Sequence, residues 1–393
     1  MEPKEQFSMK AFIQPNMISW SRSRYDLTEE CLAKKLHVKP EQVVAWEGGE
    51  DFPTLRQAQN LAKVLHIPLG WLYLETPPED KAALPDLRTI RNAEHPELSP
   101  DFKEQLNEVL FKQQEYADLI IEEGAEALPF VGKFSVTDRL ETVVKDIRTA
   151  LGIDQDMRRN TSSWEDFLRD FIHRAESVGI LVMRSGIVGN NTHRPLSVEE
   201  FRGFAISDVF APVIFINGRD AKAAQIFTLA HELAHLWVGA SGISNQAMNA
   251  SGGNAQRIEV FCNRVAAELL VPAADMTRLW VQTKDAEENI HALIRHFRVS
   301  GLVMLYRAKE LCCIDQATFR VLYQMEMTRH QRRPTGAGGP PPHVTIPARN
   351  SHLLTDTILA AAYEGRILFR DACRVLGAKM NTLQTLALES GVL

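Results

Sequence analysis

The chain has 393 residues, of which 45% are hydrophobic and 24% charged, and its formal net charge is −6. This length suggests about two or three domains with a sizeable core, and the charge excludes a general basic surface, so any contact with DNA must come from a local patch. Because the five cysteines form no C-x-x-C pair, the first residues lack a signal-peptide core and no apolar run reaches transmembrane length, we expect a cytoplasmic protein with no disulfide framework and no membrane partner.

Residues 15–75 have the pattern of a compact bundle of short helices. Thr28 is placed to cap one helix, Pro40 suits the first turn of the next, and Gly48-Gly49 ends that second helix. A short turn over residues 37–39 separates the two helices. Two short helices joined by a tight turn predict a helix-turn-helix.

This bundle resembles the XRE (Cro/repressor-type) helix-turn-helix in Leu32-Ala33, Val38, Ala45-Trp46-Glu47-Gly48-Gly49, Pro53-Thr54-Leu55, Leu61-Ala62 and Leu65. The resemblance implies a DNA-binding domain over residues 12–76. The side chains that we expect at DNA are Lys39, Gln42, Arg22, Arg24, Lys34 and Lys35. The second helix also carries Glu41 and Glu47, whereas phosphate contacts need cations. Recognition of a protein by the same surface is therefore the alternative.

The next part of the chain predicts a linker, helices and then a small sheet. Residues 77–100 are rich in proline and charge, which is typical of a linker. Helical patterns follow over residues 101–123, 132–151 and 163–179. Segments rich in β-branched residues then predict three strands, over residues 179–189, 201–207 and 212–216. A short hairpin-like break separates the second and third strands.

The sequence His231-Glu232-Leu233-Ala234-His235 directly follows this predicted sheet and is an H-E-x-x-H motif. Residues four apart share one face of an α-helix, so His231 and His235 can bind one metal ion together. Glu232 is then placed to take a proton from a water molecule on that metal and to act as general base. Asp220 can cap the helix and Gly239 can end it. We expect Zn²⁺ as the cofactor.

A catalytic zinc site usually has a third protein ligand. The next predicted helix, over residues 255–270, offers two acids, Glu259 and Glu268. They are nine residues apart and project from opposite faces, so only one of them can serve the site. Periodicity alone leaves the choice open.

The pattern Glu259-x-x-Cys262-Asn263-x-x-Ala266-Ala267-x-Leu269-Leu270-x-Pro272, after His231-Glu232-x-x-His235, resembles the ImmA/IrrE family of metallopeptidases. In that family the Glu that opens the second motif is the third zinc ligand, so the resemblance implies Glu259. Cys262 stands where a small residue is common; packing is the expected role, with a fourth ligand or a redox-sensitive position as the alternatives. No pattern identifies the group that stabilises the oxyanion, and Tyr306, His193 and His291 are the candidates.

The fold class that we predict is α+β: an all-α helix-turn-helix domain, a mainly helical zincin-like metallopeptidase domain with a small sheet, and a C-terminal helical segment. The predicted boundaries are 12–76 for the first domain, 77–100 for the linker, 101–328 for the metallopeptidase domain (zinc core about 179–275), 329–350 for a flexible linker and 351–393 for the last helices. Gly239 to Asn254 is predicted as a flexible loop that forms either a lid or a connector.

These predictions favour a regulatory zinc endopeptidase, and the family resemblance implies a transcriptional repressor as its protein substrate. The alternative is a DNA-binding regulator, or an antitoxin that binds a toxin in a toxin–antitoxin-like system, whose metal site is structural or vestigial. A third hypothesis is an interaction module in which the N-terminal bundle binds another repressor.

Overall fold

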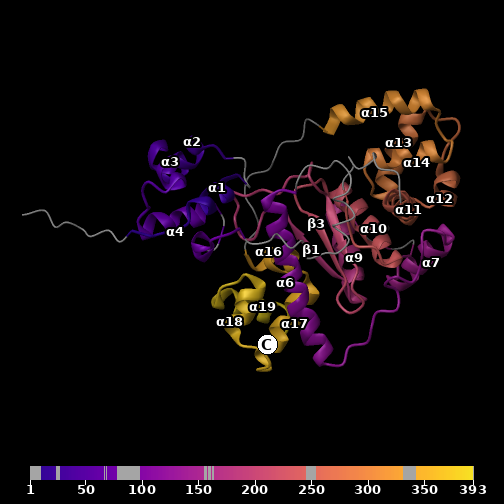
Figure 1. Cartoon of the computed structure of the whole chain (residues 1–393). Helices are drawn as coiled ribbons and strands as arrows, with labels where there is room; N and C mark the ends of the chain where they lie inside the picture. Colours follow the sequence, from indigo (N-terminus) through magenta and orange to yellow (C-terminus); the bar gives the residue numbers. More distant parts are fainter. Residues whose placement is uncertain are drawn as a thin grey trace, which may run out of the picture. The chain divides into compact units, whose positions relative to one another are not determined.

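The computed structural model describes residues 10–392 except 24–26, 66, 68, 78–97, 155–156, 158–160, 162, 245–253 and 331–341. The described residues divide into two compact units, the first made of residues up to 77 and 98–103 and the second of residues from 104 onward (Figure 1). Each unit has its own hydrophobic core. Within the described ranges, no helix has the length and apolar character needed to cross a membrane.

The first unit is a bundle of short helices. They are α1 (Pro15–Ser23), α2 (Glu29–Leu36), α3 (Pro40–Gly48), α4 (Leu55–Val64) and the 3-10 helix η1 (Leu69–Tyr73). Thr28 caps α2 through its side chain, and Pro40 begins α3, as predicted. Buried residues from every helix, among them Ile18, Leu32 and Trp46, form one core. The predicted pair of helices with a short turn is therefore present.

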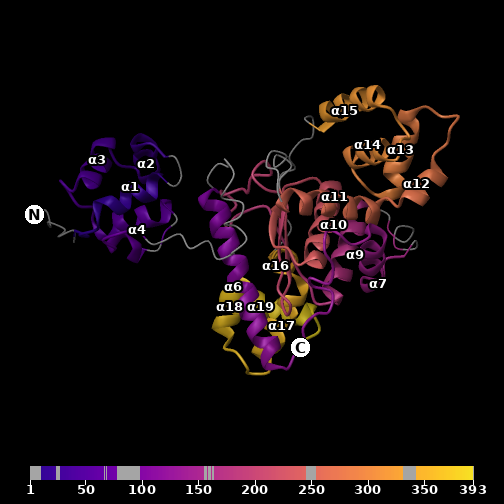
Figure 2. The ribbon, with the colours of Figure 1, turned by 45° about the vertical axis from the view of Figure 1, so that its right-hand side comes forward.

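The second unit contains the remaining helices, except that residues 100–103 of α6 are counted with the first unit. They are α6 (Pro100–Glu122), α7 (Leu140–Ala150), α9 (Trp164–Ser177), α10 (Lys222–Val238), α11 (Asn254–Leu270), α12 (Ala273–Leu279), α13 (Ala286–Phe297), α14 (Gly301–Glu310), α15 (Gln316–His330), α16 (Pro342–Asn350), α17 (His352–Tyr363), α18 (Phe369–Leu376) and α19 (Met380–Glu389). In both views α6 lies beside the C-terminal helices (Figure 2), where Arg374 packs over the ring of Phe111.

A small mixed sheet completes this unit and confirms the predicted α+β class. Its strands are β1 (Leu181–Ser185), β2 (Gly203–Ile206), β3 (Val213–Asn217) and β4 (Gly242–Ser244), in the order β1-β3-β2-β4. β1 runs parallel to β3, whereas β2 is antiparallel to both β3 and β4. The predicted hairpin between the second and third strands is thus confirmed. The start of the predicted loop after Gly239 forms β4, and the rest of that loop, up to residue 253, lies outside the described residues.

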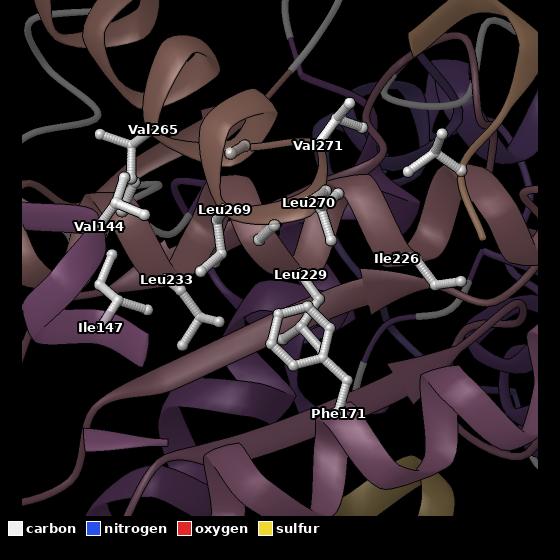
Figure 3. Close-up of a cluster of buried hydrophobic side chains, with 14 of the residues drawn as sticks. Val144, Ile147, Phe171, Ile226, Leu229, Leu233, Val265, Leu269, Leu270 and Val271 are labelled. Atoms are coloured by element: carbon white, nitrogen blue, oxygen red, sulfur yellow. The ribbon is translucent and has the colours of Figure 1, made fainter. Parts of the chain in front are cut away.

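Helix α10 runs through the centre of the second unit and is buried along most of its length. Its apolar side chains, such as Leu229 and Leu233, pack against α9 and against Leu269 and Leu270 of α11 (Figure 3). The helix ends at Gly239, whose φ of 71° places it in the left-handed region that favours glycine, as the sequence predicted. A buried helix of this kind gives its side chains little freedom to move.

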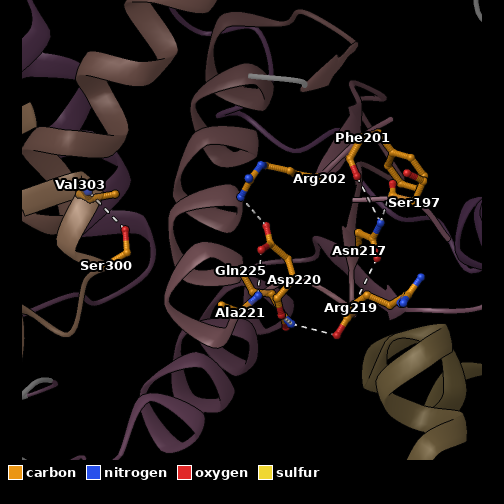
Figure 4. A network of polar contacts seen from close by, with 11 residues as sticks. Ser197, Phe201, Arg202, Asn217, Arg219, Asp220, Ala221, Gln225, Ser300 and Val303 are labelled. Carbon is orange, nitrogen blue, oxygen red and sulfur yellow. Dashed lines mark hydrogen bonds and ion pairs between the residues drawn. The ribbon is translucent and has the colours of Figure 1, made fainter. Parts of the chain in front are cut away.

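The start of α10 differs from the prediction. The residue at the N-cap is Ala221, not Asp220. The Asp220 carboxylate accepts a hydrogen bond from the Ala221 N–H (2.8 Å) and forms an ion pair with Arg202 (2.7 Å) (Figure 4). Asp220 therefore joins the start of α10 to the residue that precedes β2, and this tertiary pairing replaces the expected local cap.

The segment before the last three helices also differs from the prediction. Residues 342–350, which we expected to belong to a flexible linker, form α16, and Ile346 on this helix is buried. The Asn350 side chain donates to the carbonyl oxygen of Leu376 (2.9 Å), which joins α16 to the end of α18. Pairing with the rest of the unit stabilises a segment whose composition alone favours a loop. The remainder of that predicted linker includes residues outside the described ranges.

A buried carboxyl group joins the C-terminal helices to α9. Glu176 accepts hydrogen bonds from the Ser351 hydroxyl (2.6 Å) and from the His352 N–H (2.8 Å). Burial raises the pKa of Glu176 to about 7, although these hydrogen bonds act in the opposite direction. The folded protein therefore holds this proton more tightly than the unfolded chain does.

We predict that this group makes stability depend on pH. A raised folded-state pKa contributes stability that is fully present below pH 4.5 and is lost as pH rises through about 7. Relative to a Glu176→Gln variant, the wild type should lose on the order of 3 kcal/mol of unfolding free energy across that window. Urea unfolding of both proteins from pH 4.5 upward measures the difference. A difference that stays constant with pH would contradict the prediction.

Candidate metal centre

Helix α10 brings two imidazoles together, as the H-E-x-x-H spacing predicts. The Nε2 atoms of His231 and His235 are 3.0 Å apart, and both residues are almost completely buried. The Nδ1 atoms of both rings are buried and have no hydrogen-bond partner among the described residues. Two buried ring nitrogens that face each other are costly unless a proton or a cation lies between them.

Helix α11 supplies the third group, and that group is Glu259. Its two carboxylate oxygens are each 3.3 Å from a histidine Nε2, one from His231 and the other from His235. Ligands placed 2.0–2.1 Å from a zinc ion in a tetrahedron are about 3.3–3.4 Å from one another. The three residues therefore fit a divalent metal ion of that size.

Glu268 lies on the opposite face of α11 and has a structural role. Its carboxylate forms an ion pair with the buried guanidinium of Arg307, and it accepts a hydrogen bond from the N–H of Ala273 at the start of α12 (3.2 Å). The structure places only Glu259, and not Glu268, beside the two imidazoles. The packing of α11 on α10 makes the choice that periodicity left open.

The electrostatics of the cluster also suit a cation. Burial opposes the charge on Glu259, but hydrogen bonds from His231 and His235 overcome it and keep the pKa of Glu259 well below its usual range. Burial likewise opposes the charged form of His235, yet Cys262, Glu259 and Glu232 together raise the pKa of His235 well above its usual value. The environment around the ring nitrogens is thus negative.

Cys262, one turn after Glu259, is completely buried and belongs to the hydrophobic core. Its thiol neighbours His235 but is not one of the three converging ligands. The structure therefore favours the packing role that we expected over a fourth ligand.

Glu232 is completely buried beside the metal ligands, at a point where β2 approaches α10 closely. A Cβ atom added to Gly203 would lie 3.3 Å from Oε1 of Glu232 and 2.4 Å from Cγ2 of Thr228. Only glycine leaves room for this approach of strand and helix. Sequence reasoning did not assign a role to Gly203, although a glycine at the start of a strand was the available signal.

We predict that Gly203→Ala disrupts the site. The new methyl group would also be 2.8 Å from the Phe215 carbonyl oxygen, so strand and helix must separate, at a cost of about 1–3 kcal/mol. We expect a lower melting temperature together with a loss of the activity that we propose for this site below. Gly70→Ala is the control, because a methyl group there meets no atom within 4 Å. Equal effects of the two substitutions would contradict this role for Gly203.

Polar contacts fix the junction between β3 and α10, the helix on which His231 and His235 lie (Figure 4). Asn217, at the end of β3, donates to the carbonyl oxygens of Ser197 and Phe201 (both 3.2 Å). Gln225 donates to the carbonyl oxygens of Gly218 (3.1 Å) and Asp220 (2.6 Å). Every one of these bonds ties α10 or β3 to an adjoining loop, which limits rotation of the helix that carries His231 and His235.

None of the three candidate oxyanion groups lies in the metal cluster. Tyr306 is 55% exposed and packs on Phe319 and Tyr323. His193 is exposed on a loop whose neighbour Arg194 pairs with Glu104 of α6. His291 lies on α13 and is not among the converging ligands.

The side chains that we expected at DNA differ in their environments. Arg22 is only 15% exposed and its guanidinium is paired with Glu47 (2.7 Å) and Glu29 (2.6 Å). Gln42 accepts a hydrogen bond from the N–H of Lys39 (3.3 Å) at the start of α3. Three of the predicted cations are exposed: Lys34, Lys35 and Lys39. Arg24 lies outside the described residues.

Comparison with known protein families assigns two segments of the chain. Residues 175–309 match the IrrE N-terminal-like domain of peptidase family M78, and residues 350–389 match a domain of unknown function, DUF8813. No helix-turn-helix family was found. No curated protein matches the chain. The chain therefore contains an IrrE N-terminal-like domain that includes His231, His235 and Glu259, which confirms the family resemblance over this region.

Proposed function

We propose that this protein is a zinc-dependent endopeptidase that cleaves a transcriptional repressor or a related regulatory protein. The observation that carries the proposal is the convergence of three ligand atoms, from His231, His235 and Glu259, within 4.8 Å of one another. Three protein ligands are typical of a catalytic zinc site, where the fourth position belongs to water or substrate, whereas structural sites usually have four. The family assignment supports the same chemistry.

The side chains of this site have separate roles in the proposed reaction. A zinc ion held by His231, His235 and Glu259 would supply a Lewis acid that polarises a peptide carbonyl and lowers the pKa of a water molecule to about 7. Glu232 takes the proton of the attacking water and then donates it to the leaving amine. Gly203 on β2 and Thr228 on α10 lie where the strand approaches the helix closely, beside the Glu232 carboxylate, and leave that side chain little room to move.

The sheet supports an extended peptide as the substrate. β4 follows α10 in sequence and pairs with β2, so an edge strand is joined directly to the metal-binding helix. An edge strand can bind an extended peptide through main-chain hydrogen bonds. We infer that a flexible or unfolded segment of the target protein enters the site in this form.

The proposal is tested by identifying new protein termini in a lysate of the host organism. The lysate is incubated with the wild-type protein and, in parallel, with Glu232→Gln, with zinc present in both. We expect a small set of new termini in the wild-type sample alone, and among their parent proteins a transcriptional regulator. Identical termini in the two samples would refute the proposed activity. Cleavage confined to unrelated proteins would refute the substrate class.

A further inference from the structure

Two segments at opposite ends of the chain share one helix-turn-helix pattern. In each, a helix of 8 residues (α2 or α18) is followed by a short turn and a second helix (α3 or α19). Buried residues occupy equivalent positions at one constant separation along the chain: Leu32 and Ala372, Leu36 and Leu376, Val43 and Leu383, Trp46 and Leu386. No gap is needed to align the two segments.

The turns of the two segments have the same backbone conformation. His37 has φ 56° and ψ 41°, and Gly377 has φ 59° and ψ 36°, so both are left-handed. The next residue in each turn closes the same hydrogen bond, from Val38 N–H to the Ala33 carbonyl (3.0 Å) and from Ala378 N–H to the Cys373 carbonyl (2.9 Å). A lysine precedes the second helix in both. This turn is a Schellman-type end of the first helix.

The outer faces of the second helices differ. On α3 the exposed face carries Glu41 and Val44, which is 56% exposed. The equivalent positions on α19 are Asn381 and Gln384, both exposed, and Thr385 follows. The Thr385 hydroxyl donates to the Asn381 carbonyl oxygen (3.2 Å), and its oxygen can still accept a hydrogen bond. In the major groove, a single Asn or Gln amide can form two hydrogen bonds to adenine. A Thr side chain can hydrogen-bond to a base or contact the methyl group of thymine.

Two exposed cations belong to the same two-helix segment. Arg370, on α18, has a side chain that is 81% exposed and is 3.5 Å from Asp371, and Lys379 is exposed directly before α19. Arg374 is used elsewhere, since it packs over Phe111. The only acid on α19, Glu389, lies at its far end. The segment thus carries both side chains that can read bases and exposed cations that can contact phosphates.

We propose that α18 and α19 form a DNA-binding helix-turn-helix, with α19 entering the major groove of duplex DNA. This assigns a role to the C-terminal segment whose matched family has no known function. The segment is fixed to the rest of its unit, because Asn190 donates to the Gly377 carbonyl oxygen (3.1 Å) and Asn350 to that of Leu376. DNA binding would therefore place the metallopeptidase domain at a defined position on the duplex.

The test is selection from a pool of random-sequence DNA duplexes with the full-length protein. We expect the wild type to enrich a sequence motif. The triple variant Asn381→Ala, Gln384→Ala, Thr385→Ala should bind the selected duplex about tenfold or more weakly, and unselected DNA nearly as before. Arg370→Ala and Lys379→Ala should each reduce the slope of log affinity against log salt by about 1.

Two controls make the outcomes distinct. The matched variant Glu41→Ala, Val44→Ala changes the equivalent face of α3 and should leave binding unchanged. The single variant Gln384→Glu keeps the shape of α19 and adds a negative charge, so it should weaken binding even if the triple variant fails to fold. The proposal is overturned if no motif is enriched, if only the α3 variant loses binding, or if the selected duplex binds all α19 variants equally well.

Discussion

Glu232→Gln should abolish peptide hydrolysis while leaving metal binding intact. Glutamine has nearly the same shape as glutamate but cannot take a proton from water, and loss of a general base costs about 10²–10⁴-fold in rate. Glu232 is not one of the three converging ligands, so the metal content of the variant should equal that of the wild type. The measurements are the rate of cleavage of a substrate protein and metal analysis of the purified proteins.

This prediction needs a control that compares the stability of Glu232→Gln with that of the wild type. Because Glu232 is completely buried, thermal unfolding must show that Glu232→Gln is folded before its activity is compared. A folded, metal-loaded variant that retains cleavage within a factor of about ten would remove Glu232 from the reaction.

Substitution of the two acids on α11 should affect different properties: one substitution should weaken metal binding, and the other should lower stability. Glu259→Ala removes one of the three converging ligands, so we expect zinc affinity to fall by more than about 100-fold, the upper range for loss of an outer-shell partner. Glu268→Ala should bind zinc normally but lower the unfolding free energy by about 2 kcal/mol, because buried Arg307 loses one of its two carboxylate partners.

Both effects are measurable on the full chain. Zinc affinity is determined by competition with a chromophoric chelator, and stability by urea unfolding of the metal-free proteins. Normal zinc affinity in Glu259→Ala, or weak zinc binding in Glu268→Ala, would reassign the third ligand. The pair is well matched, since the same substitution is made twice on one helix.

The sequence predicted the local parts of this structure well. Caps such as Thr28 and the left-handed end of α10 at Gly239 depend on a few neighbouring residues, and both are present. The α+β class followed from the change of hydrophobic period near Gly179. Predictions that rest on local composition failed where distant residues intervene. Asp220 pairs with Arg202 instead of capping α10, and α16 forms in a segment that resembles a linker.

The environment of charged residues also depends on the fold. Arg22 is a cation in a predicted DNA-binding unit, but two glutamates, one from α2 and one from α3, neutralise it. Sequence alone could not show this, because Glu47 is far from Arg22 along the chain. Only lysines and arginines that are not paired with acids are available to contact DNA phosphates. A count of all lysines and arginines therefore overstates the affinity of this surface for DNA.

The metal centre shows most clearly which features the sequence determined and which only the tertiary structure decided. The sequence by itself determined that His231 and His235 share a face with Glu232 beside them, because residues four apart on a helix are always neighbours. It also limited the third ligand to one of two acids, and a family resemblance was needed to choose. Only the tertiary structure brings Glu259 within 3.3 Å of both imidazoles and Glu268 to Arg307. The reason is physical: helix periodicity fixes the angle between side chains on one helix, whereas the packing of α11 on α10 decides which face meets the site.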